Sequence, residues 1–317
     1  MPSVLILGGT GLVGSAIIRH LFNLNSIRSS DKYSLYFPSR EEIDLDDKHA
    51  FKQLYSDLKP DFVIICAAKV GGIVDNSTHP ADFILSNISI IYNVFNSVKD
   101  VYVETDFKPT RILFMGSSCI YPKECQQPIY EEDLMTGPLE STNEGYAISK
   151  IVGVTLCKKM REQYNIDCVA LMPCNMYGPN DTYHSQKSHV IPGMIKRMSE
   201  SMDRPTFKVW GTGKPKREFM HVDDLARACS VIMNTKKCEY LLNVGSGEEI
   251  SISELASLIA KEIGYKGKLI YRSDLPDGTM RKLMCSDRIR NLGWKPSISI
   301  KKGIKIVVKE FVGKSKD

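Results

Sequence analysis

Short runs of consecutive hydrophobic residues alternate with longer amphipathic stretches along the first half of the chain. Such runs have the length and the uniform apolarity of strands that are buried on both faces. The clearest ones occupy residues 4–7, 62–66, 111–116 and 168–172. A shorter strand is expected at 33–38, and residues 81–103 have the length and composition of a long helix. This alternation predicts an α/β fold, a Rossmann-type doubly wound parallel sheet with helices on both faces.

After Gly178 the alternation of strand-like and helix-like segments becomes less regular. Residues 184–189 are polar, residues 210–216 are rich in Gly and Lys, and residues 274–278 have the composition of a turn. These segments predict a smaller, mixed α/β lobe over the sheet. Residues 218–233 and 240–244 are again typical of the main fold, so we expect the chain to return to it there.

Composition excludes several classes of protein. With 317 residues, 43% of them hydrophobic and 25% charged, the chain has enough apolar material for one large unit or two lobes. The net charge of +5, without a basic block interleaved with aromatics, argues against a nucleic-acid partner. No run reaches the roughly 18 apolar residues of a membrane span, and the apolar start is too short for a signal-peptide core. Nine scattered cysteines without a C-x-x-C predict no disulfide framework and no metal site, and they fit free thiols in the cytoplasm.

A glycine-rich turn follows the first expected strand and opens a helix. The turn consists of Gly8, Gly9, Thr10, Gly11, Leu12, Val13 and Gly14. Glycines at this spacing let the backbone turn tightly and approach a pyrophosphate, which then lies against the helix N-terminus. At the end of the second strand stands Arg40 in place of an acid that would hold a ribose 2′-hydroxyl. Because an arginine neutralises a 2′-phosphate, we predict NADP(H) rather than NAD, although Arg40 also fits a solvated surface charge.

Tyr146 and Lys150 lie four residues apart and therefore share one face of a helix. A phenol ordinarily has a pKa near 10, and an adjacent ammonium is expected to lower the pKa of Tyr146. Lys150 can also bond a nicotinamide ribose, and Ser117, which follows the strand at 111–116, can bond the reacting oxygen. The trio predicts proton exchange with a carbonyl or alcohol while hydride moves to or from a nicotinamide.

Together, the glycine turn, Ser117 and the Tyr146/Lys150 pair resemble the extended short-chain dehydrogenase/reductase superfamily. More specific motifs resemble the GDP-L-fucose synthase family. They are GSSCIYPK at 116–123, NMYGP at 175–179, SHVIP at 188–192 and REFMHVDD at 217–224. This resemblance implies a cytoplasmic homodimer that uses NADPH and acts on GDP-4-keto-6-deoxy-D-mannose. The implied product is GDP-L-fucose, made by inverting C3 and C5 and then reducing the C4 ketone.

Inversion needs a base on one face of the sugar and an acid on the other. A proton beside a carbonyl is acidic because the enolate places charge on the oxygen, which Tyr146 and Ser117 can stabilise. A thiol and an imidazole ordinarily titrate near 8.5 and 6.5, so both can exchange protons near neutrality. The resemblance makes Cys119 the base and His189 the acid, whereas without it Cys119 fits a buried structural thiol. His184 and His221 are expected to be structural.

The resemblance also implies contacts for a nucleotide diphosphate, which needs cations and a packing surface for its base. Taken singly, each such residue equally fits a surface charge or a core side chain. The expected substrate residues are Arg197, Trp210, Arg217 and Asp277, with Lys282 as a further diphosphate candidate. The remaining expected cofactor contacts are Ala67, Ala68, Gly116, Ser118, Pro173, Cys174, Asn175, Met176 and His189.

We therefore predict an NADP(H)-binding Rossmann domain over residues 1–177, with a return segment at about 219–247. A nucleotide-sugar-binding lobe is predicted over residues 178–218 and 248–317. Two other hypotheses remain: a nucleotide-sugar 4-epimerase or dehydratase of the same superfamily, and a non-catalytic NADP(H) sensor. A dehydratase carries acids where this chain has Ser118 and Cys119, and sensors often lack the Tyr/Lys pair, which is intact here.

Overall fold

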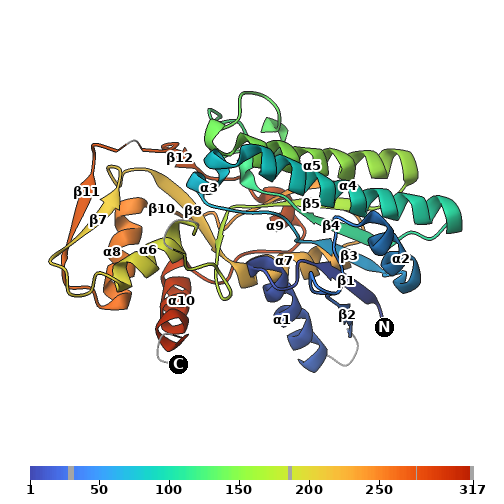
Figure 1. Cartoon of the computed structure of the whole chain (residues 1–317), viewed down its shortest axis with the longest axis horizontal. Coiled ribbons are helices and arrows are strands. Elements are labelled where there is room, and N and C mark those ends of the chain that lie inside the picture. Colours follow the sequence, from blue (N-terminus) through green and yellow to red (C-terminus); the bar gives the residue numbers. More distant parts are fainter. Residues whose placement is uncertain (28–31, 185–187, 276, 315–317) are drawn as a thin grey trace.

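The computed structural model describes residues 1–27, 32–184, 188–275 and 277–314. Its main sheet has six parallel strands in the order β2-β1-β3-β4-β5-β9 (Figure 1). These strands are β1 (Ser3–Leu7), β2 (Ser34–Tyr36), β3 (Phe62–Ile65), β4 (Arg111–Met115), β5 (Cys168–Pro173) and β9 (Leu241–Val244). The predicted α/β parallel-sheet fold is confirmed.

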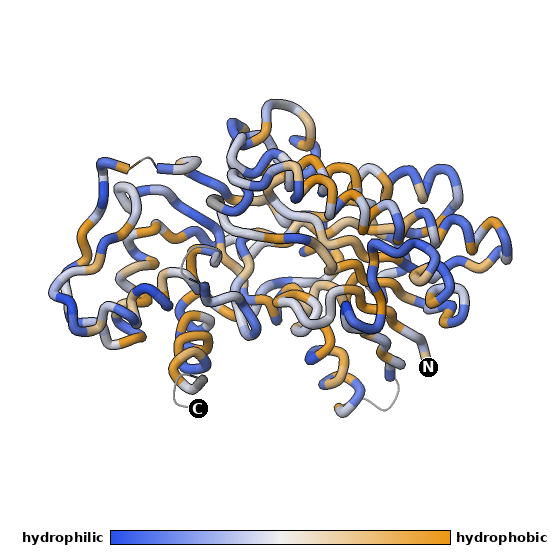
Figure 2. Tube along the Cα trace, viewed as in Figure 1, coloured by the Kyte–Doolittle hydropathy of each residue, from blue (hydrophilic) through white to orange (hydrophobic). Residues whose placement is uncertain are grey.

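Helices cover both faces of this sheet (Figure 1). One face carries α2 (Lys48–Leu58), α4 (Pro80–Thr105) and α5 (Glu144–Tyr164), and the other carries α1 (Leu12–Ile27) and α7 (Val222–Asn234). The long helix expected at 81–103 is α4. Because β1, β3, β4 and β5 are buried between the two helical layers, their hydrophobic runs are continuous rather than alternating, as Figure 2 shows.

A smaller set of elements lies beside the sheet. Strands β6 (Asn175–Tyr177), β10 (Glu249–Ser251) and β12 (Arg281–Lys282) each pair with β8 (Lys216–His221), and β7 (Thr206–Trp210) pairs with β11 (Lys268–Arg272). Helices α6 (Val190–Ser199), α8 (Ile252–Ile263) and α10 (Ile300–Lys314) accompany them. The short helices are α3 (Ile73–Thr78) and α9 (Asp287–Asn291), with single 3₁₀ turns η1 (Ser118–Ile120), η2 (Glu131–Asp133) and η3 (Ser141–Asn143).

Two hydrophobic clusters hold these parts together. The larger one fills the space around the main sheet, and the smaller one joins α6, α8 and α10 to β7 and β8. Residues 216–221 therefore belong to the smaller sheet, and the chain re-enters the main sheet through α7 and β9. The division into a cofactor domain and a substrate lobe stays a prediction.

Local sequence signals explain where these helices begin and end. At the start of α8, the Ser251 hydroxyl accepts the Glu254 N–H while the Glu254 carboxylate accepts the Ser251 N–H, and Gly264 ends the helix in a left-handed conformation. At α2, the Asp47 carboxylate accepts the N–H groups of His49 and Ala50 in the first turn. Within the described residues, no helix combines the length and the apolarity that crossing a membrane requires.

Candidate active site

Lys150 and Tyr146 lie one turn apart on α5, as their spacing predicts. The Lys150 side chain is buried, and its Nζ donates to the backbone carbonyl of Met115, the last residue of β4, at 2.8 Å. The same Nζ lies 5.7 Å from the centroid of the Tyr146 ring. The ammonium is thus fixed between the end of a strand and the phenol.

The expected lowering of the Tyr146 pKa by Lys150 is wrong for this structure. Burial raises the pKa of Tyr146 well above 10, the nearby Cys119 thiol raises it further, and the hydrogen bond with Ser117 only partly opposes this. Lys150 is itself affected, because burial lowers its pKa to about 8. Tyr146 is therefore a protonated phenol at neutral pH, the form in which it can donate a proton.

Ser117 and Cys119 come from the turn that follows β4. Ser117 has an extended backbone, and its Oγ accepts the N–H of Cys119 at 3.2 Å, which starts the 3₁₀ turn η1. The Sγ of Cys119 accepts a hydrogen bond from the side-chain amide of Asn143 at 3.3 Å. The structure therefore brings Ser117, Cys119, Tyr146 and Lys150 together at the start of α5.

Asn143 was not predicted from the sequence. It ends the turn η3, immediately before α5, and an asparagine there is ordinarily interpreted as a helix cap. The only signal in the sequence was its position three residues before Tyr146.

His189 comes from a different segment of the chain. It occupies the N-cap position of α6, is exposed to solvent and makes no capping hydrogen bond. The protein around its ring lowers its pKa through desolvation. In the described ranges, no hydrogen bond or ion pair joins His189 to Cys119, so its role as acid stays a prediction. His221, by contrast, is fully buried and its Nδ1 accepts the Asp223 N–H at the start of α7, which fits the structural role expected for it.

The glycine turn has the geometry of a phosphate cradle. Gly8 has a φ of +85°, and a Cβ there would lie 2.7 Å from the backbone nitrogen of Ala67. A Cβ on Gly14 would lie 2.2 Å from the carbonyl oxygen of Gly8. In contrast, Gly11 is exposed, and a Cβ there would lie 3.6 Å from its nearest neighbour, the carbonyl oxygen of Gly8. The glycines thus hold the strand, turn and helix close together and leave the exposed backbone beside Thr10 and Gly11 open to a pyrophosphate.

The other predicted cofactor residues follow the carboxyl ends of the parallel strands, where ligands of such sheets bind. Arg40 follows β2 and is exposed. Ala67 and Ala68 follow β3, Gly116 and Ser118 follow β4, and Pro173, Cys174, Asn175 and Met176 end or follow β5. The Cys174 side chain belongs to the main hydrophobic cluster, and the Asn175 amide donates to the Glu218 carbonyl, so these two side chains are engaged within the protein.

Two of the predicted substrate residues are neighbours on parallel strands. Arg217 on β8 pairs in register with Lys282 on β12, and burial lowers the pKa of Arg217. Like charges in register repel each other, so this arrangement favours an anion between them. The Asp277 carboxylate accepts both the N–H and the hydroxyl of Thr212, at 2.9 and 2.6 Å.

The remaining two predicted substrate residues are accessible. Trp210, at the end of β7, is 66% exposed. Arg197 is exposed in the last turn of α6.

Residues 4–245 match the model of the NAD dependent epimerase/dehydratase family. The chain belongs to this family. It is 45% identical to the putative GDP-L-fucose synthase 2 of Arabidopsis thaliana over 95% of this chain and 89% of that one. It is 42% identical to the GDP-L-fucose synthase of Escherichia coli, over 95% and 94%. The crystal structure of a GDP-L-fucose synthetase from Naegleria fowleri bound to NADP superposes with a TM-score of 0.87 at 25% identity, covering 99% and 95%. The predicted resemblance to this branch of the epimerase/dehydratase family is confirmed.

Proposed function

We propose that this chain is an NADPH-dependent epimerase–reductase that converts GDP-4-keto-6-deoxy-D-mannose to GDP-L-fucose. The observation that carries this proposal is the position of Cys119 next to the residues that a ketone reductase uses. Cys119 lies beside Ser117 and close enough to Tyr146 to raise the phenol's pKa. A ketone reductase needs Ser117, Tyr146 and Lys150, but it has no use for a thiol at this point.

The first stage is proton exchange next to the ketone. Cys119 Sγ removes the proton from C3 or C5, and the electron pair moves onto the C4 oxygen as the enolate forms. The hydroxyl groups of Ser117 and Tyr146 donate hydrogen bonds to that oxygen, which stabilises its charge. His189 then delivers a proton to the opposite face of the ring, which inverts the carbon.

The second stage is reduction of the C4 ketone. NADPH, held at the glycine turn, would supply the hydride for C4 when bound. Tyr146 donates its proton to the C4 oxygen, and its raised pKa keeps that proton available at neutral pH. Lys150, fixed by Met115, holds a positive charge beside the phenolate that results.

The nucleotide part of the substrate is held outside this centre. Arg217 and Lys282 bind the diphosphate between them, because an anion there reduces the repulsion between the two cations. Exposed Trp210 supplies a face for the base, and Arg197 and Asp277 complete the site.

The direct test incubates purified protein with GDP-4-keto-6-deoxy-D-mannose and NADPH. We expect the absorbance of NADPH to fall in step with the appearance of GDP-L-fucose, identified by chromatography and NMR. If the only product were the sugar reduced at C4 and not inverted at C3 and C5, the protein would be a simple reductase and not an epimerase–reductase. If neither this substrate nor another 4-keto sugar oxidised NADPH, both the epimerase–reductase and the simple reductase activity would be excluded.

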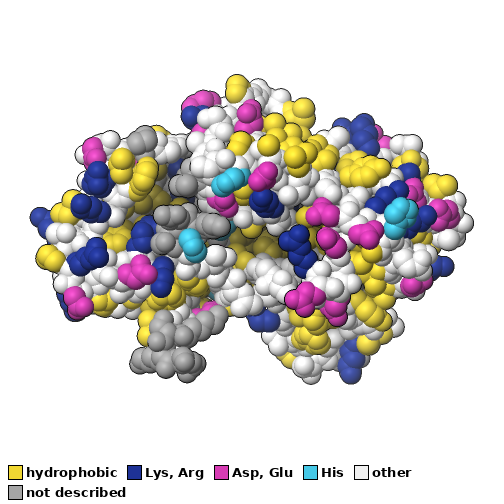
Figure 3. All heavy atoms as spheres, viewed as in Figure 1, with side chains coloured by type: hydrophobic (Ala, Val, Ile, Leu, Met, Phe, Trp, Pro, Cys, Tyr) yellow, Lys and Arg dark blue, Asp and Glu magenta, His cyan; other side chains and the backbone are white. Residues whose placement is uncertain are grey.

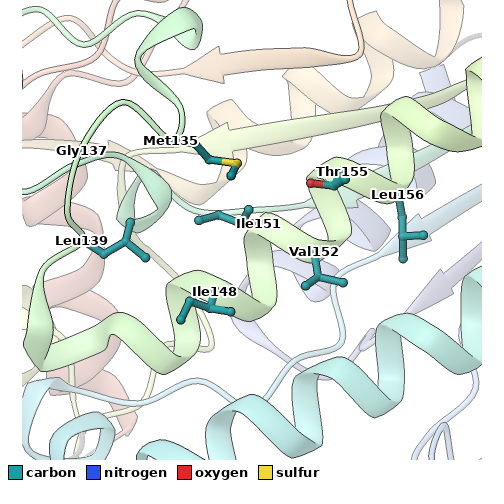
Figure 4. Close-up of a pocket in the computed structure, with 8 residues that line it drawn as sticks. All are labelled: Met135, Gly137, Leu139, Ile148, Ile151, Val152, Thr155 and Leu156. Carbon is teal, nitrogen blue, oxygen red and sulfur yellow. The ribbon is translucent and has the colours of Figure 1, made fainter.

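We also infer that the protein is a homodimer joined through the outer face of α5. Ile148, Ile151, Val152 and Thr155 form a stripe along this face, and Met135 and Leu139 point toward it from the preceding loop (Figure 4). They line an apolar pocket of about 560 Å³, and Figure 3 shows hydrophobic side chains gathered along α5. A contiguous apolar helix face at the surface is typical of a subunit contact, and a two-fold dimer is the commonest form.

Light scattering after size exclusion tests the dimer. We expect a dimeric mass for the wild type and a monomeric mass for Ile148→Glu. The matched control is Ile306→Glu on α10, another partly exposed isoleucine, which should remain dimeric. A monomeric wild type at micromolar concentration would contradict the proposal.

The cytoplasm is the compartment we propose. All nine cysteines are free in the structure, including the pair of neighbouring buried thiols Cys157 and Cys168. Thiols persist in this state where glutathione keeps them reduced.

A further inference from the structure

We propose that Asn143 is a positioning residue for Cys119, and that its side-chain amide stabilises the thiolate form of this base. The inference rests on the proposed function, because it matters for catalysis only if Cys119 removes a proton. The amide Nδ2 donates to Sγ at 3.3 Å, and a donor gains strength when its acceptor becomes an anion. The bond is therefore worth more to the thiolate than to the thiol.

The Asn143 side chain contacts the sulfur instead of capping the helix. It stands at the N-cap position of α5, where an asparagine side chain usually accepts the N–H of a residue in the first turn. Here the side chain caps nothing, and its Oδ1 is buried without a hydrogen-bond partner among the described residues. A missing cap and an unpaired buried acceptor each cost stability. Such local conflicts are expected at functional sites, where geometry is selected for chemistry.

The surroundings agree with an anion at this position. Since Asn143 directly precedes α5, the sulfur that it contacts lies at the N-terminal end of a 21-residue helix, whose positive dipole end favours a thiolate. Two titratable groups on α5 lie near Cys119. Tyr146 is neutral at physiological pH, and the Lys150 ammonium is bonded to the Met115 carbonyl. On α3, which packs against η3, Asp75 is paired with His79 at 3.3 Å. Asn143 is thus the neutral donor in direct contact with the sulfur.

Two substitutions separate this role from a structural one. Asn143→Asp leaves a residue that favours the N-cap position but replaces the donor by a carboxylate that repels a thiolate. Asn143→Ala removes the donor and leaves a residue that cannot cap the helix. If Asn143 only stabilised α5, the Asp variant would behave like the wild type. If it stabilises the thiolate, the Asp variant is the more impaired of the two.

The readout is alkylation by iodoacetamide, followed at single cysteines by peptide mass spectrometry from pH 6 to 10. Only thiolates react, so the midpoint of each profile reports their formation. We expect the rate at Cys119 at pH 7 to fall about tenfold in Asn143→Ala and further in Asn143→Asp, with the midpoints moving to higher pH. Cys125, which is also partly exposed, serves as the internal reference and should not change. Thr142→Ala, in the same turn, is the matched control and should resemble the wild type.

Each result decides the question. The proposal is overturned if the alkylation rate of Cys119 in Asn143→Asp follows the wild-type pH profile. It is also overturned if the alkylation rate of Cys125 changes as much as that of Cys119. Should Asn143→Ala fail to fold, Asn143→Ser, which caps a helix without an amide, replaces it. Because alkylation needs no substrate, a wild type that fails to exchange deuterium at C3 and C5 refutes the proposed function and leaves this test standing.

Discussion

Lys150 donates a 2.8 Å hydrogen bond to the carbonyl oxygen of Met115, so the last residue of β4 fixes the ammonium that faces Tyr146. Burial lowers the pKa of Lys150 to about 8, below its ordinary value of 10.5. The ammonium is therefore present below about pH 8 and is lost as the pH rises through that value. We expect this relationship to set the alkaline limit of the reaction.

Reduction should weaken above about pH 8. We expect kcat/KM for NADPH oxidation with the keto sugar to fall about tenfold per pH unit beyond that point, since kcat/KM follows the ionisation of the free enzyme. Lys150→Met should lower kcat/KM by about 10²–10⁴-fold at pH 7. Lys159→Met, which alters an exposed lysine of the same helix, is the control and should keep the wild-type profile. A wild-type profile that stays flat to pH 10 would contradict the role of Lys150.

Tyr146→Phe should separate the two stages. Without its hydroxyl, no proton reaches the C4 oxygen, so NADPH oxidation should fall by about 10²–10⁴-fold. Ser117 still stabilises the enolate, so deuterium exchange from solvent at C3 and C5 should continue and is measured by NMR of the recovered sugar. Normal NADPH turnover in this variant would refute the assignment.

Removing either diphosphate cation should weaken substrate binding without affecting the cofactor. Arg217→Met and Lys282→Met should each raise KM for the GDP-sugar about tenfold or more, as expected for a lost hydrogen bond between charged groups. KM for NADPH should stay the same. Arg281→Met is the matched control, because Arg281 is the strand neighbour of Lys282 but forms a bidentate pair with Glu249. An unchanged KM in both variants would remove this pair from the substrate site.

Asp181 should make stability depend on pH. Burial raises its pKa to about 7 from 3.8, and its Oδ2 is buried without a hydrogen-bond partner among the described residues. Between about pH 4 and pH 7 the unfolded chain ionises this group while the folded chain does not, so its contribution becomes more destabilising as the pH rises. Asn at this position stays neutral and can still accept the Thr182 N–H at the oxygen. The melting temperature of Asp181→Asn minus that of the wild type should therefore increase across this window and then level off. A difference independent of pH would be contrary to this account.

The fold followed from the sequence because its signals are local. Continuous apolar runs become strands such as β3 and β5, and the close approach of Gly14 to the backbone of Gly8 lies within one strand–turn–helix unit. The Tyr146/Lys150 pair is local in the same sense, since helical geometry alone aligns the two side chains. The motif resemblance then supplied Cys119, which no spacing rule identifies.

What the sequence did not reveal depends on the surroundings of single groups. The pKa of Tyr146 is raised by burial and by the neighbouring Cys119, and only the hydrogen bond with Ser117 opposes them. Asn143 looks like an ordinary helix cap until its amide is seen against a sulfur 24 positions earlier in the chain. The register that aligns Arg217 with Lys282 joins residues 65 positions apart, and no local pattern encodes it.

The most direct test of the whole account is solvent-deuterium incorporation into the keto sugar by Cys119→Ser. Serine is a far weaker base than a thiolate, so exchange at C3 and C5 should fall at least a hundredfold, while the affinity for NADPH, measured by fluorescence, stays at the wild-type level. Exchange at the wild-type rate would show that another group abstracts the protons and that the sulfur beside Tyr146 has no part in inversion.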